Sequence, residues 1–111
     1  MQYVTLRGID RPVSRLVFGC AYPGMIEGRD ESRWLDSVYG MGFTAFDTAE
    51  NYGKSEEVLG NWMASRGIRE ELTVITKGCH PYEGRPRVSP IRRNSWRRYN
   101  PLRLTSCAGI G

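Results

Sequence analysis

Three residues of this chain have side chains and a spacing that suit acid catalysis: Asp47, Tyr52 and Lys77. Asp47 and Lys77 each follow a short apolar run, and Tyr52 lies shortly after Asp47. A tyrosine hydroxyl has an unperturbed pKa of about 10, too high for an efficient acid at neutral pH, but an adjacent ammonium lowers it. A carboxylate beside that ammonium keeps it charged and oriented. A tyrosine hydroxyl placed in this way can protonate a carbonyl oxygen as hydride reaches the carbon, which indicates reduction of an aldehyde or ketone.

The segments around these residues alternate between strand and helix patterns. This order, with short loops, is typical of right-handed βαβ units in a parallel sheet. Ligands of such sheets bind beyond the carboxyl ends of the strands, where Asp47 and Lys77 both fall. The predicted strands and helices occupy, in order, residues 16–19, 30–41, 43–46, 55–66 and 72–76.

Turns, caps and buried faces can be assigned within this pattern. We expect a hairpin with its turn at residues 8–12 before the first strand, and a loop containing Pro23, Gly24 and Gly28 after it. The expected N-caps are Asp30 or Ser32 for the first helix and Ser55 for the second, which has Glu56 and Glu57 in its first turn. The expected buried faces are Trp34, Leu35, Val38, Tyr39 and Met41 in the first helix, and Val58, Leu59, Trp62 and Met63 in the second.

The segment from Gly42 to Gly60, together with residues 74–77, closely resembles the aldo-keto reductase family. It contains, in order, Asp-Thr-Ala at a strand end, Tyr-Gly, Ser-Glu and Leu-Gly in a helix, and Thr-Lys at the next strand end. The likeness runs from about residue 3 to Pro90. The resemblance implies the N-terminal part of a (β/α)8 TIM barrel, with about three βα units after an N-terminal hairpin.

The resemblance also implies roles for individual residues. Tyr52 corresponds to the catalytic acid, Lys77 to the ammonium beside it, and Asp47 to the partner of that lysine. Gly19, Cys20 and Asp47 would lie near the cofactor, which is NADPH in this family, and the substrate would be a small carbonyl compound. The family's fourth catalytic residue is a histidine at the end of the fourth strand, and no position here matches it.

Two readings of function follow. The first is an NADPH-dependent reductase present as a truncated, inactive fragment, because the later strands that bind the cofactor phosphates are missing. The alternative is a non-catalytic partial barrel that associates with itself or with a full-length relative through an exposed sheet edge.

Length and composition narrow the remaining classes. The chain has 111 residues, whereas a complete eight-fold barrel has roughly 250. No apolar run is long enough to span a bilayer and no signal peptide is evident, so a cytoplasmic location is expected. Three widely spaced cysteines and a single histidine argue against disulfides and against a metal site. We interpret Cys20, Cys79 and His80 as structural. His80 lies in the wrong element to be the catalytic histidine.

The C-terminal residues differ from the rest in charge. Residues 1–84 carry 9 Lys and Arg against 12 Asp and Glu, whereas residues 85–111 carry 7 Arg and no acid. We therefore predict a partial barrel domain at residues 1–90 and an irregular, Arg-rich tail at residues 91–111 that is disordered or translated out of frame. A nucleic-acid surface is the disfavoured interpretation of this tail.

Overall fold

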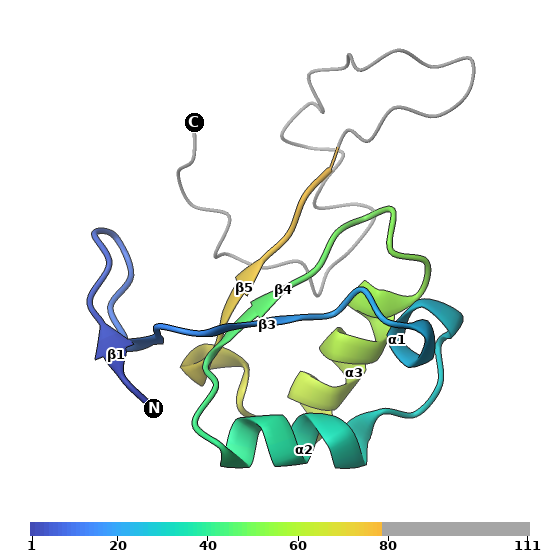
Figure 1. Ribbon diagram of the computed structural model, residues 1–111, viewed down its shortest axis with the longest axis horizontal. Helices are drawn as coiled ribbons and strands as arrows, with labels where there is room; N and C mark the ends of the chain where they lie inside the picture. The colour runs from blue at the N-terminus through green and yellow to red at the C-terminus, as the bar shows by residue number, and fades with distance from the viewer. Residues whose placement is uncertain (79–111) are drawn as a thin grey trace.

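The computed structural model describes residues 1–78, whose core is a three-stranded parallel sheet with helices packed on one face (Figure 1). The strands lie in the order β3, β4, β5, and no barrel closes within the described residues. This confirms the predicted α/β class and parallel sheet. The predictions for Cys79, His80, the domain boundary at residue 90 and the tail fall outside the described residues. The strands are β3 (Val17–Gly19), β4 (Ala45–Asp47) and β5 (Thr73–Ile75).

The helices correspond to the predicted ones with two additions, α1 and a short 3₁₀ helix. The segment expected to be a loop contains the short helix α1, so that prediction was wrong. Pro23 opens α1, where its missing N–H costs nothing, and Gly28 ends it in a left-handed conformation with φ of 79°. The helices are α1 (Pro23–Glu27), α2 (Ser32–Gly40), α3 (Ser55–Arg66) and the 3₁₀ helix η1 (Arg69–Glu71).

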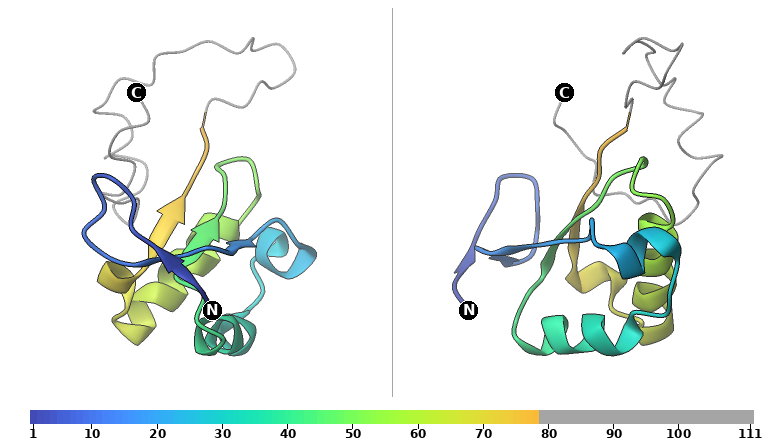
Figure 2. Two further views of the ribbon diagram at one scale, coloured as in Figure 1. Left: turned by 60° about the vertical axis from the view of Figure 1, so that its left-hand side comes forward. Right: turned by 45° about the vertical axis from the view of Figure 1, so that its right-hand side comes forward.

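The predicted N-terminal hairpin is confirmed and consists of β1 (Tyr3–Val4) paired with β2 (Val13–Ser14). The Ser14 hydroxyl oxygen accepts the backbone N–H groups of Thr44 at 3.0 Å and Ala45 at 3.1 Å, where β4 begins. The hairpin is thereby attached at the N-terminal ends of the strands, on the side of the sheet away from the helices (Figure 2). The carboxyl ends, which the sequence predicts to carry the chemistry, lie at the other end of the sheet.

The sheet alternates between two faces. Phe18, Phe46 and Val74 are in register across the three strands and belong to the helix-side core. The Phe46 ring is fully buried and lies 5.6 Å from the Trp62 ring of α3. The other buried members of this core are Cys20, Met25, Leu35, Val38, Leu59, Met63, Ile68 and Leu72.

The predicted buried face of α3 is confirmed, and that of α2 is confirmed only in part. Leu35 and Val38 are fully buried, but Trp34 is 48% and Met41 56% exposed. The predicted stripe was too wide, because α2 contacts the core through residues three apart, and Met41 lies past the end of the helix.

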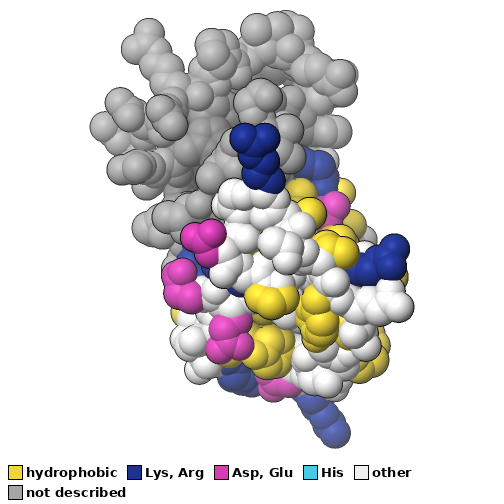
Figure 3. Space-filling view, turned by 90° about the vertical axis from the view of Figure 1, so that its left-hand side faces the viewer, with side chains coloured by type: hydrophobic (Ala, Val, Ile, Leu, Met, Phe, Trp, Pro, Cys, Tyr) yellow, Lys and Arg dark blue, Asp and Glu magenta, His cyan; other side chains and the backbone are white. Residues whose placement is uncertain are grey.

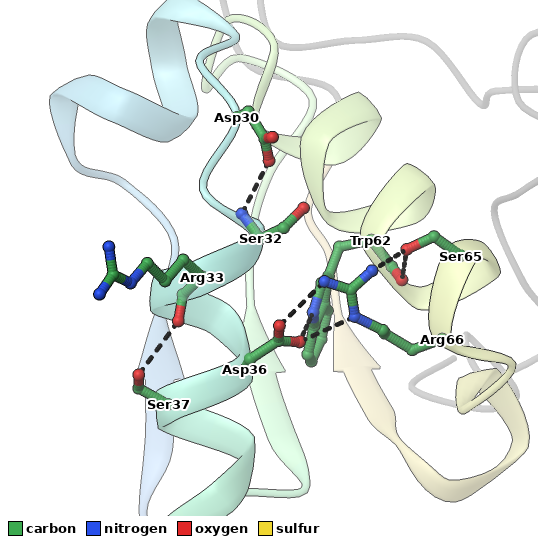
Figure 4. A network of polar contacts seen from close by, with 8 residues as sticks. All are labelled: Asp30, Ser32, Arg33, Asp36, Ser37, Trp62, Ser65 and Arg66. Carbon is green, nitrogen blue, oxygen red and sulfur yellow. Dashed lines mark hydrogen bonds and ion pairs between the residues drawn. The ribbon is translucent and has the colours of Figure 1, made fainter.

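Polar contacts join α2 to α3 (Figure 4). The Asp36 carboxylate accepts hydrogen bonds from Trp62 Nε1 at 2.8 Å and from Arg66 Nε and Nη2 at 3.0 and 2.9 Å. The hydrogen bonds from Arg66 and then from Trp62 lower the pKa of Asp36 to about 2. At the start of α2, the Asp30 carboxylate accepts the Ser32 backbone N–H at 3.0 Å, although the N-cap residue itself is Glu31.

Candidate active site

The structure brings Asp47 and Lys77 together at the carboxyl ends of adjacent strands. Asp47 is the last residue of β4, and Lys77 follows the end of β5. The Lys77 ammonium donates to the Asp47 carboxylate and also, at 2.9 Å, to the backbone carbonyl of Thr48. The Lys77 side chain is 50% exposed and that of Asp47 is 39% exposed, so the pair is open to a ligand. The contact predicted from strand-end spacing is present.

Asp47 favours the protonated form of Lys77. Partial burial lowers the pKa of Lys77, but the hydrogen bond to Asp47 and its negative charge, with a smaller contribution from Tyr52, raise it above its ordinary value. An ordinary lysine already carries its proton at neutral pH. Lys77 is therefore a fixed positive charge with two acceptors holding its position.

Tyr52 lies beside this charge. The Lys77 ammonium is 5.3 Å from the centroid of the Tyr52 ring. Tyr52 belongs to the loop between β4 and α3, where its N–H donates to the Ala49 carbonyl at 3.1 Å and its own carbonyl accepts from the N–H of Ser55 at 2.9 Å. The structure therefore places all three predicted catalytic residues at one edge of the sheet.

The two other residues expected near a cofactor differ in accessibility. Gly19 pairs in register with Asp47, and a Cβ atom added to Gly19 would meet no atom within 4 Å. The Cys20 side chain is fully buried in the helix-side core, and desolvation, with the charge of Asp47, raises the pKa of its thiol to about 12. Gly19 leaves open space beside Asp47. The Cys20 thiol instead packs among hydrophobic side chains of the core, as expected of a structural residue.

Two buried residues of this site were not identified from the sequence as part of it. Thr48 and Ser55 are 1% and 0% exposed, and their hydroxyl oxygens lie 3.0 Å apart. Ser55 was expected to be an N-cap, which is wrong: the N-cap residue is Lys54, and the Ser55 hydroxyl instead donates to the Cys20 carbonyl at 2.8 Å. The available signal was a Thr and a Ser at opposite ends of the loop that carries Tyr52.

A groove of about 480 Å³ lies elsewhere, between α3 and the connection from α1 to α2. Its lining includes none of the three predicted catalytic residues. The cations along it are already paired: Arg29 with Glu27, Lys54 with Glu57, and Arg66 with Asp36. Because the three predicted catalytic residues meet at the strand ends and not in this groove, the strand-end cluster is the better candidate for the site.

Residues 1–78 hold no group of three or more His, Cys, Asp or Glu side chains placed to bind a metal ion. None of the helices in this part of the chain has the length and apolar character to cross a membrane.

Comparison with known proteins places these residues in context. The family model described as "Aldo/keto reductase family" matches residues 15–99. Norsolorinic acid reductase B of Aspergillus parasiticus is 44% identical over 52 residues, which cover 45% of this chain and 14% of that protein. Aldo-keto reductase str7 of Strobilurus tenacellus is 38% identical over 55 residues, covering 49% of this chain and 16% of that protein.

A third relative is the aryl-alcohol dehydrogenase [NADP(+)] of Phanerodontia chrysosporium, 38% identical over 56 residues, which cover 49% of this chain and 14% of that protein. The matched part of this chain thus spans between 14% and 16% of the length of these three relatives.

Proposed function

This chain belongs to the aldo/keto reductase family of oxidoreductases, and we propose that it carries the proton-donating part of an active site for NADPH-dependent reduction of an aldehyde or ketone. The observation that supports this most strongly is the Lys77 ammonium, held by Asp47 and Thr48 and directed at the Tyr52 ring. A phenol beside a fixed positive charge is suited to donate a proton at neutral pH.

The chemistry assigns one task to each residue. Tyr52 gives its hydroxyl proton to the carbonyl oxygen of the substrate, and Lys77 stabilises the phenolate that remains. Asp47 keeps Lys77 charged and in place. Bound NADPH would supply hydride to the carbonyl carbon. Because the positive charge of Lys77 is fixed before the reaction begins, little reorganisation is needed as negative charge develops on Tyr52.

The described residues fit one end of the cofactor. The open space at Gly19, next to Asp47, suits the close approach of a flat nicotinamide ring. Lys77 is already paired with Asp47 and is therefore not available for the cofactor phosphates. We therefore propose that residues 1–78 contact the nicotinamide end and that phosphate binding depends on residues beyond them.

We expect the 111 residues alone, as a truncated part of the reductase, to show little or no turnover. The face of the sheet that borders the site exposes Val17 and Ile75 to solvent, by 45% and 41%. Water at this face weakens the electrostatic interactions on which proton donation depends. The direct measurement is NADPH oxidation by the purified chain with benzaldehyde, chosen because several relatives are named aryl-alcohol dehydrogenases. Turnover that disappears in Tyr52→Phe would overturn the expectation of inactivity.

A chimaera tests the proposed chemistry itself. Residues 15–78 would replace the matching segment of the aryl-alcohol dehydrogenase of Phanerodontia chrysosporium. We expect NADPH-dependent aldehyde reduction by this chimaera, and a loss of roughly 100-fold or more in kcat on Tyr52→Phe. Tyr39→Phe is the matched control, since Tyr39 lies on α2 and bonds Glu71. Equal rates for the two variants would refute the role of Tyr52.

A second candidate function is the non-catalytic module that associates through its sheet edge. Cys20 N–H donates to the Asp47 carbonyl, so the alternate residues Val17 and Gly19 direct their backbone groups outward, where no described strand pairs with them. Apolar side chains are visible on the side of the molecule that carries the hairpin (Figure 3). A discrete oligomer with cooperative melting, measured by light scattering and calorimetry, would favour this function, and a monomer would exclude self-association.

A further inference from the structure

The loop that carries Tyr52 is closed at its base by two buried hydroxyl groups. Thr48 begins the loop directly after β4, and Ser55 begins α3 at its other end. Their hydroxyl oxygens are 3.0 Å apart, and both side chains are shielded from solvent. A hydrogen bond between these two residues therefore fixes the separation of the two ends of the loop.

The direction of this hydrogen bond follows from the other contacts. A serine hydroxyl has one proton to donate, and Ser55 donates it to the Cys20 carbonyl at 2.8 Å. Thr48 must then be the donor in the bond to Ser55. The resulting chain of hydrogen bonds runs from Thr48 through Ser55 to the residue that follows β3, so it connects the end of one strand to the end of its neighbour.

Thr48 is also bonded through its backbone on the other side. Its N–H donates to the Ile75 carbonyl of β5 at 2.8 Å, and its carbonyl accepts from the Lys77 ammonium at 2.9 Å. Thr48 thus contacts Lys77 through its backbone and the far end of the Tyr52 loop through its side chain. A shift of Thr48 would therefore change the position of Lys77 relative to the loop that carries Tyr52.

A separate contact supports the loop from outside. Gly53 has φ of +52°, and a Cβ atom added there would lie 2.5 Å from the Ile26 carbonyl oxygen of α1. Lys54 N–H donates to the same carbonyl at 2.9 Å. The loop is therefore held by α1 at its outer side and by the hydroxyl pair at its base.

We propose that Thr48 and Ser55 are positioning residues whose hydroxyl pair sets the placement of Tyr52 relative to Lys77. The significance for catalysis rests on the proposed function of Tyr52 as the acid. Neither hydroxyl contacts substrate, because both are buried and hydrogen-bonded within the protein. Their contribution is to maintain the short separation between phenol and ammonium before any ligand binds.

The test measures the coupling between Tyr52 and Lys77 in the 111-residue chain, without cofactor or substrate. The six tyrosines are replaced by 3-fluorotyrosine, and the ¹⁹F resonance of Tyr52 is identified by its loss in Tyr52→Phe. Its change on Lys77→Met is then compared between backgrounds. Thr48→Val removes the hydroxyl with little change in shape, Thr48→Ser retains it, and Ser55→Ala removes the partner. Ser65→Ala, a serine of the same helix bonded to the Trp62 carbonyl, is the matched control.

We expect Thr48→Val and Ser55→Ala to reduce the ¹⁹F response to about half or less of the wild-type value, because the interaction of charge and ring falls with distance. Thr48→Ser and Ser65→Ala should retain the full response. A full response in Thr48→Val and Ser55→Ala, with unchanged circular dichroism, would overturn the proposal. If both variants lose their helical signal, the pair is a determinant of folding instead, and the proposal is also wrong.

This readout is independent of turnover. A reduced response together with an inactive chimaera would leave the positioning role standing and refute the proposed function. An active, Tyr52-dependent chimaera with an unchanged response would do the reverse.

Discussion

The two faces of the parallel sheet differ in how much of their surroundings residues 1–78 supply. On the helix side, Phe46 and Trp62 are almost completely shielded, and α1, α2 and α3 cover the strands. On the other side, Val17 and Ile75 remain exposed, and the strand ends carry Asp47 and Lys77. Burial on the helix side stabilises the fold, and the exposed side carries the residues of the candidate site. The residues that form the core and the residues of the candidate site therefore lie on different sides of the sheet.

Two tryptophans, Trp62 of α3 and Trp34 of α2, provide the largest expected contrast in stability. Trp62 is 2% exposed and its ring lies 5.6 Å from that of Phe46, whereas Trp34 is 48% exposed and forms a T-shaped pair with the Phe18 ring at 6.4 Å. We expect Trp62→Ala to lower the free energy of unfolding by about 3–5 kcal/mol and Trp34→Ala by about 0.5–1.5 kcal/mol. Urea denaturation followed by circular dichroism measures both. Similar losses for the two variants would contradict the assignment of Trp62 to the core and of Trp34 to its exposed margin.

The open face predicts an effect on association and little effect on folding. Replacing Val17 and Ile75 together by threonine keeps β-branched side chains in the strands and makes the exposed face more polar. We expect the free energy of unfolding to change by no more than about 1 kcal/mol, because exposed substitutions usually have small effects. Any oligomer seen by light scattering should dissociate. An oligomer that persists in this double variant must use another surface.

A smaller, pH-dependent effect is expected from the contact between α2 and α3. The pKa of Asp36 is lowered to about 2 from an ordinary 3.8 in the folded chain. The stabilisation it gives is therefore present above about pH 4 and is lost as the pH falls toward 2. Asp36→Asn keeps an oxygen for Trp62 and removes the charge that Arg66 pairs with. Its melting temperature should fall less than that of the wild type between pH 4 and pH 2, and parallel curves would show that Asp36 contributes nothing.

Local signals predicted most of the fold. The apolar runs and helical spacing identified all three parallel strands and both longer helices, because each strand is buried on its helix side and α3 buries Leu59, Trp62 and Met63 three and four residues apart. Helix α1 was missed because five residues that include proline and glycine carry no periodic signal. The exposure of Trp34 could not be predicted either, since it depends on which neighbours cover α2.

The site was predictable to the same degree. Asp47 and Lys77 follow strand ends, so a parallel sheet brings them together, and the sequence is sufficient for that inference. The hydrogen bond from Ser55 to Cys20 could not be predicted, because a serine before two glutamates has the pattern of a helix N-cap. Only the packing of α3 against β3 brings its hydroxyl to the Cys20 carbonyl.

Residues 1–78 already hold Lys77 as a fixed positive charge through Asp47. The chain has two lysines, Lys54 and Lys77, so trace acetylation across a pH series, quantified by mass spectrometry, reports on Lys77 individually with Lys54 as the internal reference. The wild-type pKa of Lys77 should lie above its ordinary 10.5. It follows that the stabilisation from this pair is complete below that pH and is lost as the pH rises past the folded pKa.

In Asp47→Asn the pKa of Lys77 should fall below the wild-type value, because burial then acts without the opposing carboxylate. Glu57→Gln, which alters the partner of Lys54 instead, should leave the pKa of Lys77 unchanged. An identical pKa of Lys77 in the wild type and in Asp47→Asn would show that the pair does not form in solution and would contradict the account.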